Sequence, residues 1–231
     1  MSVRPLRLPV DSGPVESVTA AVHAPAGEGP AVLLAPGAGG DLEGAGLVAL
    51  AEVLAELGCT VVRANLPYRE AGQRGAPRAD RSVGHYAQLL AAARAEVAPD
   101  ASWIVGGKSY GGRVASLGVA EGQIAADGLL FYGYPLHPPG KPEQLRTDHW
   151  PAIRVPTLFL QGSHDTFGTA DEVRPHLTRL PRRATLVAVE GGDHSLDVAG
   201  TRAPDGVRRP ATEVLQRLGP QIAEWLRSLA E

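Results

Sequence analysis

The chain has 231 residues, of which 44% are hydrophobic and 20% charged, with a formal net charge of −3. This composition is typical of a folded globular protein, and the small charge argues against a nucleic-acid partner, which would need a clear excess of Lys and Arg. The single cysteine, Cys59, excludes an intrachain disulfide, and no apolar run has the length of a signal peptide or membrane span. We therefore expect one domain, residues 1–231, in the cytoplasm and without a membrane partner.

Strand-like and helix-like segments alternate along the chain, with no internal repeat or long linker. The expected strands are 15–24, 31–35, 59–64, 103–106, 129–134, 157–161 and 184–189. The expected helices are 43–57, 82–97, a segment that ends at about 121, 169–180 and 213–229. This alternation predicts an α/β domain with a mostly parallel sheet of about eight strands flanked by helices.

Two connections stand out by their length. Residues 66–80 form an Arg-, Gly- and Pro-bearing loop, and residues 135–155 form a Pro-rich connection with room for one helical turn. The second is too short for a large lid domain. We therefore expect an open cleft.

The strongest motif is Gly-Lys-Ser-Tyr-Gly at residues 107–111, which matches the G-x-S-x-G pattern. An apolar strand-like run precedes it and a helix-like run follows it, so Ser109 would stand on a tight turn from strand to helix. Side chains two residues before and after the serine would collide there, which explains Gly107 and Gly111. The competing interpretation is a Gly-rich start of a helix with an ordinary serine cap.

A serine hydroxyl needs a histidine to take its proton and a carboxylate to orient that histidine. Asp165 follows the expected strand 157–161, and His194 follows the expected strand 184–189. Both would lie at the carboxyl edge of the sheet, where the active sites of open α/β sheets gather. We therefore predict Ser109 as nucleophile, Asp165 as acid and His194 as base.

Other residues compete for these roles. His137 also follows a strand end and is the rival base, while Asp193 and Asp197 are alternative acids. Asp193 is the weaker candidate because an immediate neighbour usually points away from the imidazole that it would orient. Asp165 could also be a plain turn residue, and His194 a surface histidine.

An oxyanion hole needs two backbone N–H donors. One is predicted at Tyr110, the residue after the nucleophile. The other is predicted in the Pro-Gly-Ala-Gly-Gly turn at 36–40, at Ala38 with Gly37 as second choice. The turn does not fit a dinucleotide-binding fingerprint, because Leu42 stands where the last glycine should be.

Three residues are candidate substrate contacts. His137 and Lys141 lie in the Pro-rich segment 134–143, which follows a strand end and could form a rigid wall of the cleft or a plain connector. Tyr68 is the third. Nearby arginines could favour an anionic substrate or simply be solvated; they are Arg69, Arg74, Arg78 and Arg81.

These motifs resemble those of the α/β-hydrolase superfamily along nearly the whole chain. More narrowly, the chain resembles the small hydrolase-like family that includes testis-expressed protein 30, and the matching stretches are 34–41, 63–68, 106–116, 133–143 and 192–195. The resemblance implies the fold described above and the triad roles of Ser109, Asp165 and His194. The chain is also distantly similar to dienelactone hydrolases, which carry a cysteine where this chain has Ser109.

The sequence therefore predicts a serine hydrolase, a carboxylic ester hydrolase, that cleaves a small ester or related acyl compound through an acyl-enzyme. No metal-ligand spacing, Walker loop or haem motif is present, so we expect no metal and no other cofactor. The expected partner is a small-molecule acyl substrate. A non-catalytic binding or scaffold protein on the same fold, and an acyltransferase, are the alternatives.

Overall fold

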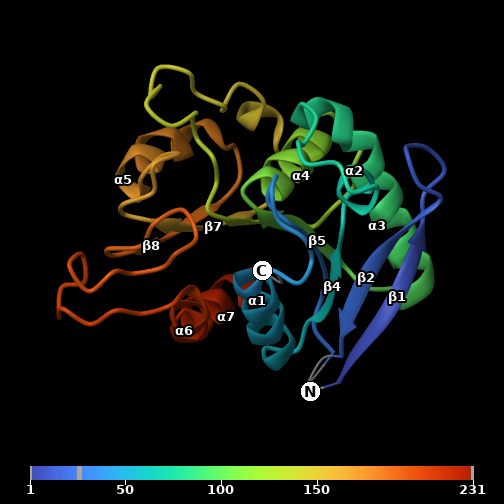
Figure 1. The fold of residues 1–231 in the computed structure, drawn as a ribbon, viewed down its shortest axis with the longest axis horizontal. Coiled ribbons are helices and arrows are strands. Elements are labelled where there is room, and N and C mark those ends of the chain that lie inside the picture. Colours follow the sequence, from blue (N-terminus) through green and yellow to red (C-terminus); the bar gives the residue numbers. More distant parts are fainter. Residues whose placement is uncertain (1, 25–27, 230–231) are drawn as a thin grey trace.

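In the computed structural model, which describes residues 2–24 and 28–229, a single sheet of eight strands runs through the molecule. Figure 1 shows how the sheet and the helices are arranged. Its strand order is β1-β2-β4-β3-β5-β6-β7-β8. The strands are β1 (Val3–Pro9), β2 (Ser17–His23), β3 (Ala31–Ala35), β4 (Thr60–Ala64), β5 (Trp103–Lys108), β6 (Gly128–Tyr132), β7 (Thr157–Gly162) and β8 (Ala184–Val189). The pairs β1–β2 and β2–β4 are antiparallel and the other five are parallel, which confirms the predicted mostly parallel sheet.

Helices cover both faces of the sheet (Figure 1). The helices are α1 (Ala45–Glu56), α2 (Pro67–Glu70), α3 (Val83–Val97), α4 (Tyr110–Ala120), α5 (Ala170–Val173), α6 (Ala211–Arg217) and α7 (Gly219–Arg227). Central strand β3 supplies side chains to two separate cores, because successive residues of a strand point to opposite faces. Leu33 packs in the core under α3 and α4, and its neighbours Val32 and Leu34 pack in the core under α1, α6 and α7.

The sheet has a topological switch point at β3. The chain leaves β3 through α1 to its neighbour β4, then returns through α3 to β5 on the other side of β3. Loops that leave adjacent strands in opposite directions open a crevice at the carboxyl edge of the sheet. The loop 36–40 follows β3, and Ser109 follows the adjacent strand β5, so the fold places both at this crevice.

The first strand, β1, was not predicted. Val3–Pro9 contains two prolines and two arginines, which hide its alternation. It pairs with β2 alone, at the edge of the sheet. Proline is tolerated on an edge strand, where one row of N–H groups has no partner strand.

Two predicted helices are wrong in extent. The predicted helix 213–229 is divided into α6 and α7 at Leu218, because Pro220 cannot donate a helical hydrogen bond. The predicted helix 169–180 is the short α5 followed by a 3-10 turn, Arg174–Arg179, which contains Pro175. The expected loop 66–80 holds α2 and the start of a 3-10 turn, Ala79–Ser82. Within 2–24 and 28–229, every helix is too short or too polar to cross a membrane.

Candidate active site

Ser109 stands on a strained turn between β5 and α4. Its φ of 49° and ψ of −107° lie where residues with a side chain are rarely found. Its backbone N–H donates to the carbonyl of Tyr132 at 2.9 Å, and its carbonyl accepts from the N–H of Arg113 at 3.0 Å. Bonds on both sides therefore hold Ser109 in this conformation.

The glycines at 107 and 111 are required by strand β3. A Cβ built on either glycine would overlap the carbonyl oxygen of Ala35, the last residue of β3. Gly107 also has a φ of 146°, which disfavours any other residue. The turn can approach β3 this closely only because both positions lack a side chain.

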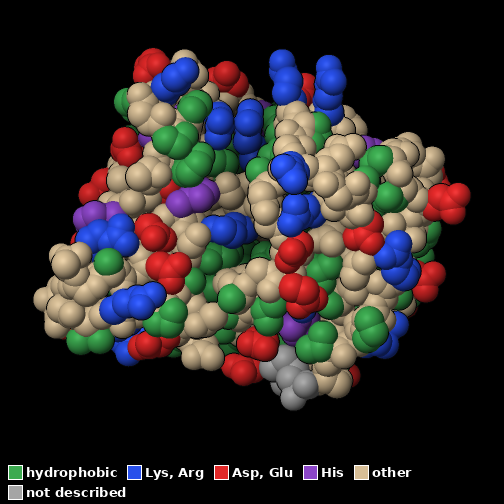
Figure 2. All heavy atoms as spheres, in the orientation of Figure 1, with side chains coloured by type: hydrophobic (Ala, Val, Ile, Leu, Met, Phe, Trp, Pro, Cys, Tyr) green, Lys and Arg blue, Asp and Glu red, His purple; other side chains and the backbone are tan. Residues whose placement is uncertain are grey.

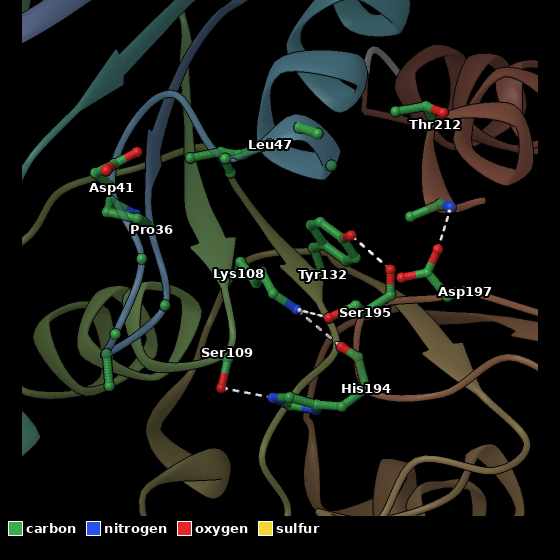
Figure 3. Close-up of a pocket in the computed structure, with 18 of the residues that line it drawn as sticks. Pro36, Asp41, Leu47, Lys108, Ser109, Tyr132, His194, Ser195, Asp197 and Thr212 are labelled. Carbon is green, nitrogen blue, oxygen red and sulfur yellow. Dashed lines mark hydrogen bonds between the residues drawn. The ribbon is translucent and has the colours of Figure 1, made fainter.

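The structure brings Ser109, Asp165 and His194 into one hydrogen-bonded series (Figure 3 shows Ser109 facing His194). The Ser109 Oγ lies 2.8 Å from the Nε2 of His194, and the Nδ1 of His194 lies 2.8 Å from the Oδ2 of Asp165. Asp165 follows β7 and is only 2% exposed, and His194 follows β8. The three side chains come from three loops at the same edge of the sheet.

Gln161, which the sequence analysis did not single out, fixes the position of Asp165. Its Nε2 donates to the Oδ2 of Asp165 at 2.9 Å and to the carbonyl of Gly168 at 2.7 Å, and its Oε1 accepts from the N–H of Tyr134 at 2.8 Å. The sequence did carry a signal, because a glutamine in the apolar strand β7 must find buried hydrogen-bond partners. The backbone N–H of Phe167 donates to the other oxygen of Asp165 at 2.8 Å.

Phe167 was also missed, and it covers the imidazole. Its ring lies 4.3 Å from the His194 ring, centroid to centroid, with the planes tilted by 32°. The side chain therefore restricts His194 to a narrow range of orientations. It is placed there by the same short loop that carries Asp165.

Lys108 holds the loop that carries His194. Its Nζ donates to the carbonyl of His194 at 3.0 Å and to the Oγ of Ser195 at 3.1 Å (Figure 3). It also lies 4.7 Å from the centre of the Tyr132 ring, whose hydroxyl donates to the carbonyl of Ser195. Burial lowers the pKa of Lys108, while nearby carboxylates oppose that shift.

The alternative acids, Asp193 and Asp197, and the rival base, His137, make hydrogen bonds outside the series of Ser109, His194 and Asp165. Asp193 Oδ1 accepts from the backbone N–H groups of Ser195 and Asp197, and Asp197 Oδ1 accepts from the N–H of Ala211. These carboxylates brace the loop around His194. His137 is buried, and its Nδ1 lies 2.8 Å from the carbonyl of Pro138.

The loop 36–40 lies beside Ser109 in a fixed shape. The hydroxyl of Tyr68 donates to the carbonyl of Ala38 at 2.9 Å, and the N–H of Gly40 donates to the carbonyl of Gly37 at 3.1 Å. Burial raises the pKa of Tyr68 to about 12, so this hydroxyl keeps its proton at neutral pH. Within the described ranges, the backbone N–H groups of Ala38 and Tyr110 make no hydrogen bond to the protein. Both are therefore free to donate to a substrate oxygen.

The three expected substrate contacts are placed elsewhere. Tyr68 is only 4% exposed, and its hydroxyl is used in the hydrogen bond to the carbonyl of Ala38. His137 is buried in the connection after β6. Lys141 is exposed on that connection. None of the three lines either cavity at Ser109 in the part of the chain that the structure describes.

Two cavities meet at Ser109. The larger one, about 510 Å³, extends toward α1 and α6 and is mostly apolar, with Leu47, Tyr132 and Pro210 among its walls. The smaller one, about 330 Å³, extends toward α4. Ser109, Ala38 and Phe167 border both, so a substrate bound at Ser109 can extend to either side. Among the described residues, no group of three or more His, Cys, Asp or Glu side chains is placed to hold a metal ion.

Comparison with known proteins gives one family. A family model for an alpha/beta hydrolase domain matches residues 28–226.

Several solved structures have the same fold. A dienelactone hydrolase from Anabaena variabilis is 20% identical, with a TM-score of 0.69 over 98% of this chain and 97% of that chain. An α/β serine hydrolase without a lid, from Xanthomonas campestris, is 22% identical, with a TM-score of 0.65 over 98% and 94%. Est1E from Butyrivibrio proteoclasticus, with ferulic acid bound, is 14% identical, with a TM-score of 0.72 over 93% and 96%. At these identities the likeness shows the fold alone.

Proposed function

The chain belongs to the α/β hydrolase family, and from this premise we propose that it is a serine hydrolase that cleaves a small ester or a related acyl compound. The observation that carries the proposal is the unbroken hydrogen-bonded series from Ser109 through His194 to Asp165 on a strained turn. A backbone strain that costs about 1–3 kcal/mol is usually retained where function needs it. The serine-hydrolase fold of the structural neighbours supports the same reaction class.

The geometry supports acylation by the following route. Asp165 accepts a hydrogen bond from the Nδ1–H of His194, so the proton of the neutral imidazole stays on Nδ1 and Nε2 is the base that faces the Ser109 hydroxyl. As the serine oxygen attacks the carbonyl carbon, His194 takes its proton, and the new oxyanion accepts hydrogen bonds from the N–H groups of Ala38 and Tyr110. His194 then gives the proton to the leaving alcohol, and the acyl group remains on Ser109.

Deacylation repeats these steps with water. His194 takes a proton from the water molecule as its oxygen attacks the acyl carbon, and then returns a proton to Ser109 as the acid leaves. General-base help typically contributes about 10²–10⁴-fold to the rate, and one oxyanion donor about 10²–10³-fold. Loss of Ser109 or His194 should therefore be severe.

The cavities support a small substrate. A volume of about 510 Å³ lies within the usual range of small-molecule sites, and its apolar walls suit a hydrocarbon part of the substrate. The connection between β6 and β7 contributes Pro135 and Arg146 to the wall of the smaller cavity and none of the residues that line the larger one, so it does not form a lid over the larger cavity. An open cleft suits a soluble small ester better than a long acyl chain that would need shielding from water.

The first test is labelling with a fluorophosphonate probe, followed by peptide mapping by mass spectrometry. The probe forms a phosphorus–oxygen bond with an activated serine and releases fluoride, so it needs almost no knowledge of the substrate. We expect label on Ser109 and none in the Ser109→Ala variant, together with hydrolysis of short-chain p-nitrophenyl esters. A well-folded sample with neither labelling nor hydrolysis would contradict the proposal and favour a binding protein on the hydrolase fold.

A further inference from the structure

Two arginines border the smaller cavity beside Ser109. Arg113 lies in the first turn of α4, just after Ser109, and its side chain borders the same cavity as Ser109. Arg146 comes from the connection between β6 and β7. Both also border an adjoining cavity of about 470 Å³. Figure 2 shows one face of the molecule, and on its upper part Lys and Arg side chains gather over α4 and the loops beside it.

Neither of these two guanidinium groups is neutralised. Within the described ranges, Arg113 and Arg146 form no ion pair with a carboxylate, the buried Nε of Arg113 has no hydrogen-bond partner, and Arg146 Nη1 donates only to the carbonyl of Pro135 at 3.3 Å. Asp80 borders the adjoining cavity, but its Oδ1 pairs with the Nε of Arg78 at 3.3 Å. The site is therefore rich in positive charge.

The surroundings of the pair do not supply the missing negative charge. Burial, together with the charge of Arg113, lowers the pKa of Arg146, as expected for two close cations. Burial and the same charge lower the pKa of nearby His149 to about 4, so this histidine is neutral at pH 7. Two half-buried cations with donors left unpaired are costly unless an anion binds to them.

We propose that Arg113 and Arg146 bind a carboxylate or phosphate group of the substrate, so that the enzyme acts on anionic esters. The inference rests on the proposed hydrolase function, because it concerns the same Ser109. A guanidinium presents its N–H groups in a planar fork that matches the oxygens of either anion. Because Arg113 and Arg146 border the same cavity as Ser109, an anionic group bound by them would be separated from the scissile carbonyl by a few bonds.

The test compares esters that differ only in charge. One series is the butyrate esters of meta-hydroxybenzoic acid, of its neutral amide, and of meta-hydroxyphenyl phosphate, which place the charge on the leaving group. The other is the monophenyl ester of adipic acid and its neutral amide, which place the charge on the acyl group. In at least one series, we expect kcat/KM to be about 10-fold or more higher for the anionic ester than for its neutral counterpart. This ratio corresponds to the free energy of one charge-assisted hydrogen bond. The carboxylate and phosphate arms show which anion the site prefers.

Variants tie the preference to the arginine pair. Arg113→Gln and Arg146→Gln should each reduce the ratio of kcat/KM between the anionic and the neutral ester, and the double variant should bring it close to one. The control Arg182→Gln removes the same charge from an exposed residue that borders none of these cavities, and should leave the ratio unchanged. An equal loss on charged and neutral esters in the pair variants would show a structural role and overturn the inference.

A binding measurement separates this inference from the proposed function. In Ser109→Ala protein, calorimetry should show tighter binding of the anionic member of the preferred series than of its amide, and this difference should be lost when Arg113→Gln is added. Labelled, active enzyme without any charge preference would refute the anion site and leave the hydrolase standing. Absence of labelling and turnover, with the affinity difference intact, would refute the hydrolase and leave the anion site.

Discussion

Gly111 offers the sharpest test of how the turn at Ser109 is built. A Cβ at this position would overlap the carbonyl of Ala35 and lie 2.8 Å from the carbonyl oxygen of Pro36. Both are backbone atoms at the end of β3, so neither can swing aside as a side chain would. Gly111→Ala must therefore push α4 away from β3 and from the loop 36–40 that follows it.

The loss of stability caused by Gly111→Ala can be compared with the effect of a matched control, Gly84→Ala. Gly111 is the second residue of α4, and Gly84 is the second residue of α3, where a Cβ would meet nothing within 4 Å. In both helices alanine is favoured over glycine by about 0.5–1 kcal/mol. Overpacking typically costs about 1–3 kcal/mol, and backbone neighbours place Gly111→Ala at the upper end. We expect a net loss of about 2 kcal/mol for Gly111→Ala and a small gain for Gly84→Ala.

The assay is thermal unfolding together with ester hydrolysis. For a chain of this length, a loss of about 2 kcal/mol lowers Tm by about 4–8 °C. Because the displaced loop carries Ala38, the proposed oxyanion donor, kcat/KM should fall about 10²-fold, the effect of a misplacement of about 1 Å. If Gly111→Ala were as stable and active as Gly84→Ala, close approach to β3 would not be the reason for the glycine.

Three further predictions concern the site and its surroundings. Asp165→Asn should lower kcat about 10⁴-fold with little change in fold, because the amide favours the wrong tautomer of the histidine; activity and circular dichroism check this together. Lys108→Met should lower kcat about 10-fold by removing two hydrogen bonds to the histidine loop, whereas Lys141→Met, on an exposed residue, should not change it; equal effects would contradict the role of Lys108. The pKa of His149 is lowered from 6.5 to about 4 by burial, so the unfolded chain takes up its proton first and stability falls as pH decreases through this window. Urea unfolding at pH 7 and pH 5 should show a smaller decrease for His149→Gln, and an unchanged decrease would refute the assignment.

The sheet could be predicted from the sequence because its central strands are continuous apolar runs between turn residues. Ala31–Ala35 is buried on both faces, and such a run has no polar residue to confuse the pattern. Prediction failed where proline was the decisive residue. Pro5 and Pro9 hide an edge strand, and Pro220 divides a helix whose apolar pattern continues through the break.

The relation among Ser109, Asp165 and His194 could be predicted because each follows a strand, and parallel strands end at the same edge of a sheet. Local sequence is enough for such a prediction, since strand ends are marked by turn residues. The residues that hold Asp165 and His194 in position were harder to predict. Gln161 acts from inside a strand, and Phe167 acts through a ring whose direction depends on how a short loop folds.

The arginine pair proposed as an anion site could not be predicted for a different physical reason. The sequence directs attention to the arginines of the loop 66–81, and of these Arg78 does border the smaller cavity. The unpaired charges beside Ser109, however, belong to Arg113 and Arg146, which lie on a helix and on a Pro-rich connection far apart in the chain. They meet because both elements pack on the same face of the sheet. A charge without a partner is a property of the folded surroundings, and no pattern in the sequence distinguishes it from a solvated arginine.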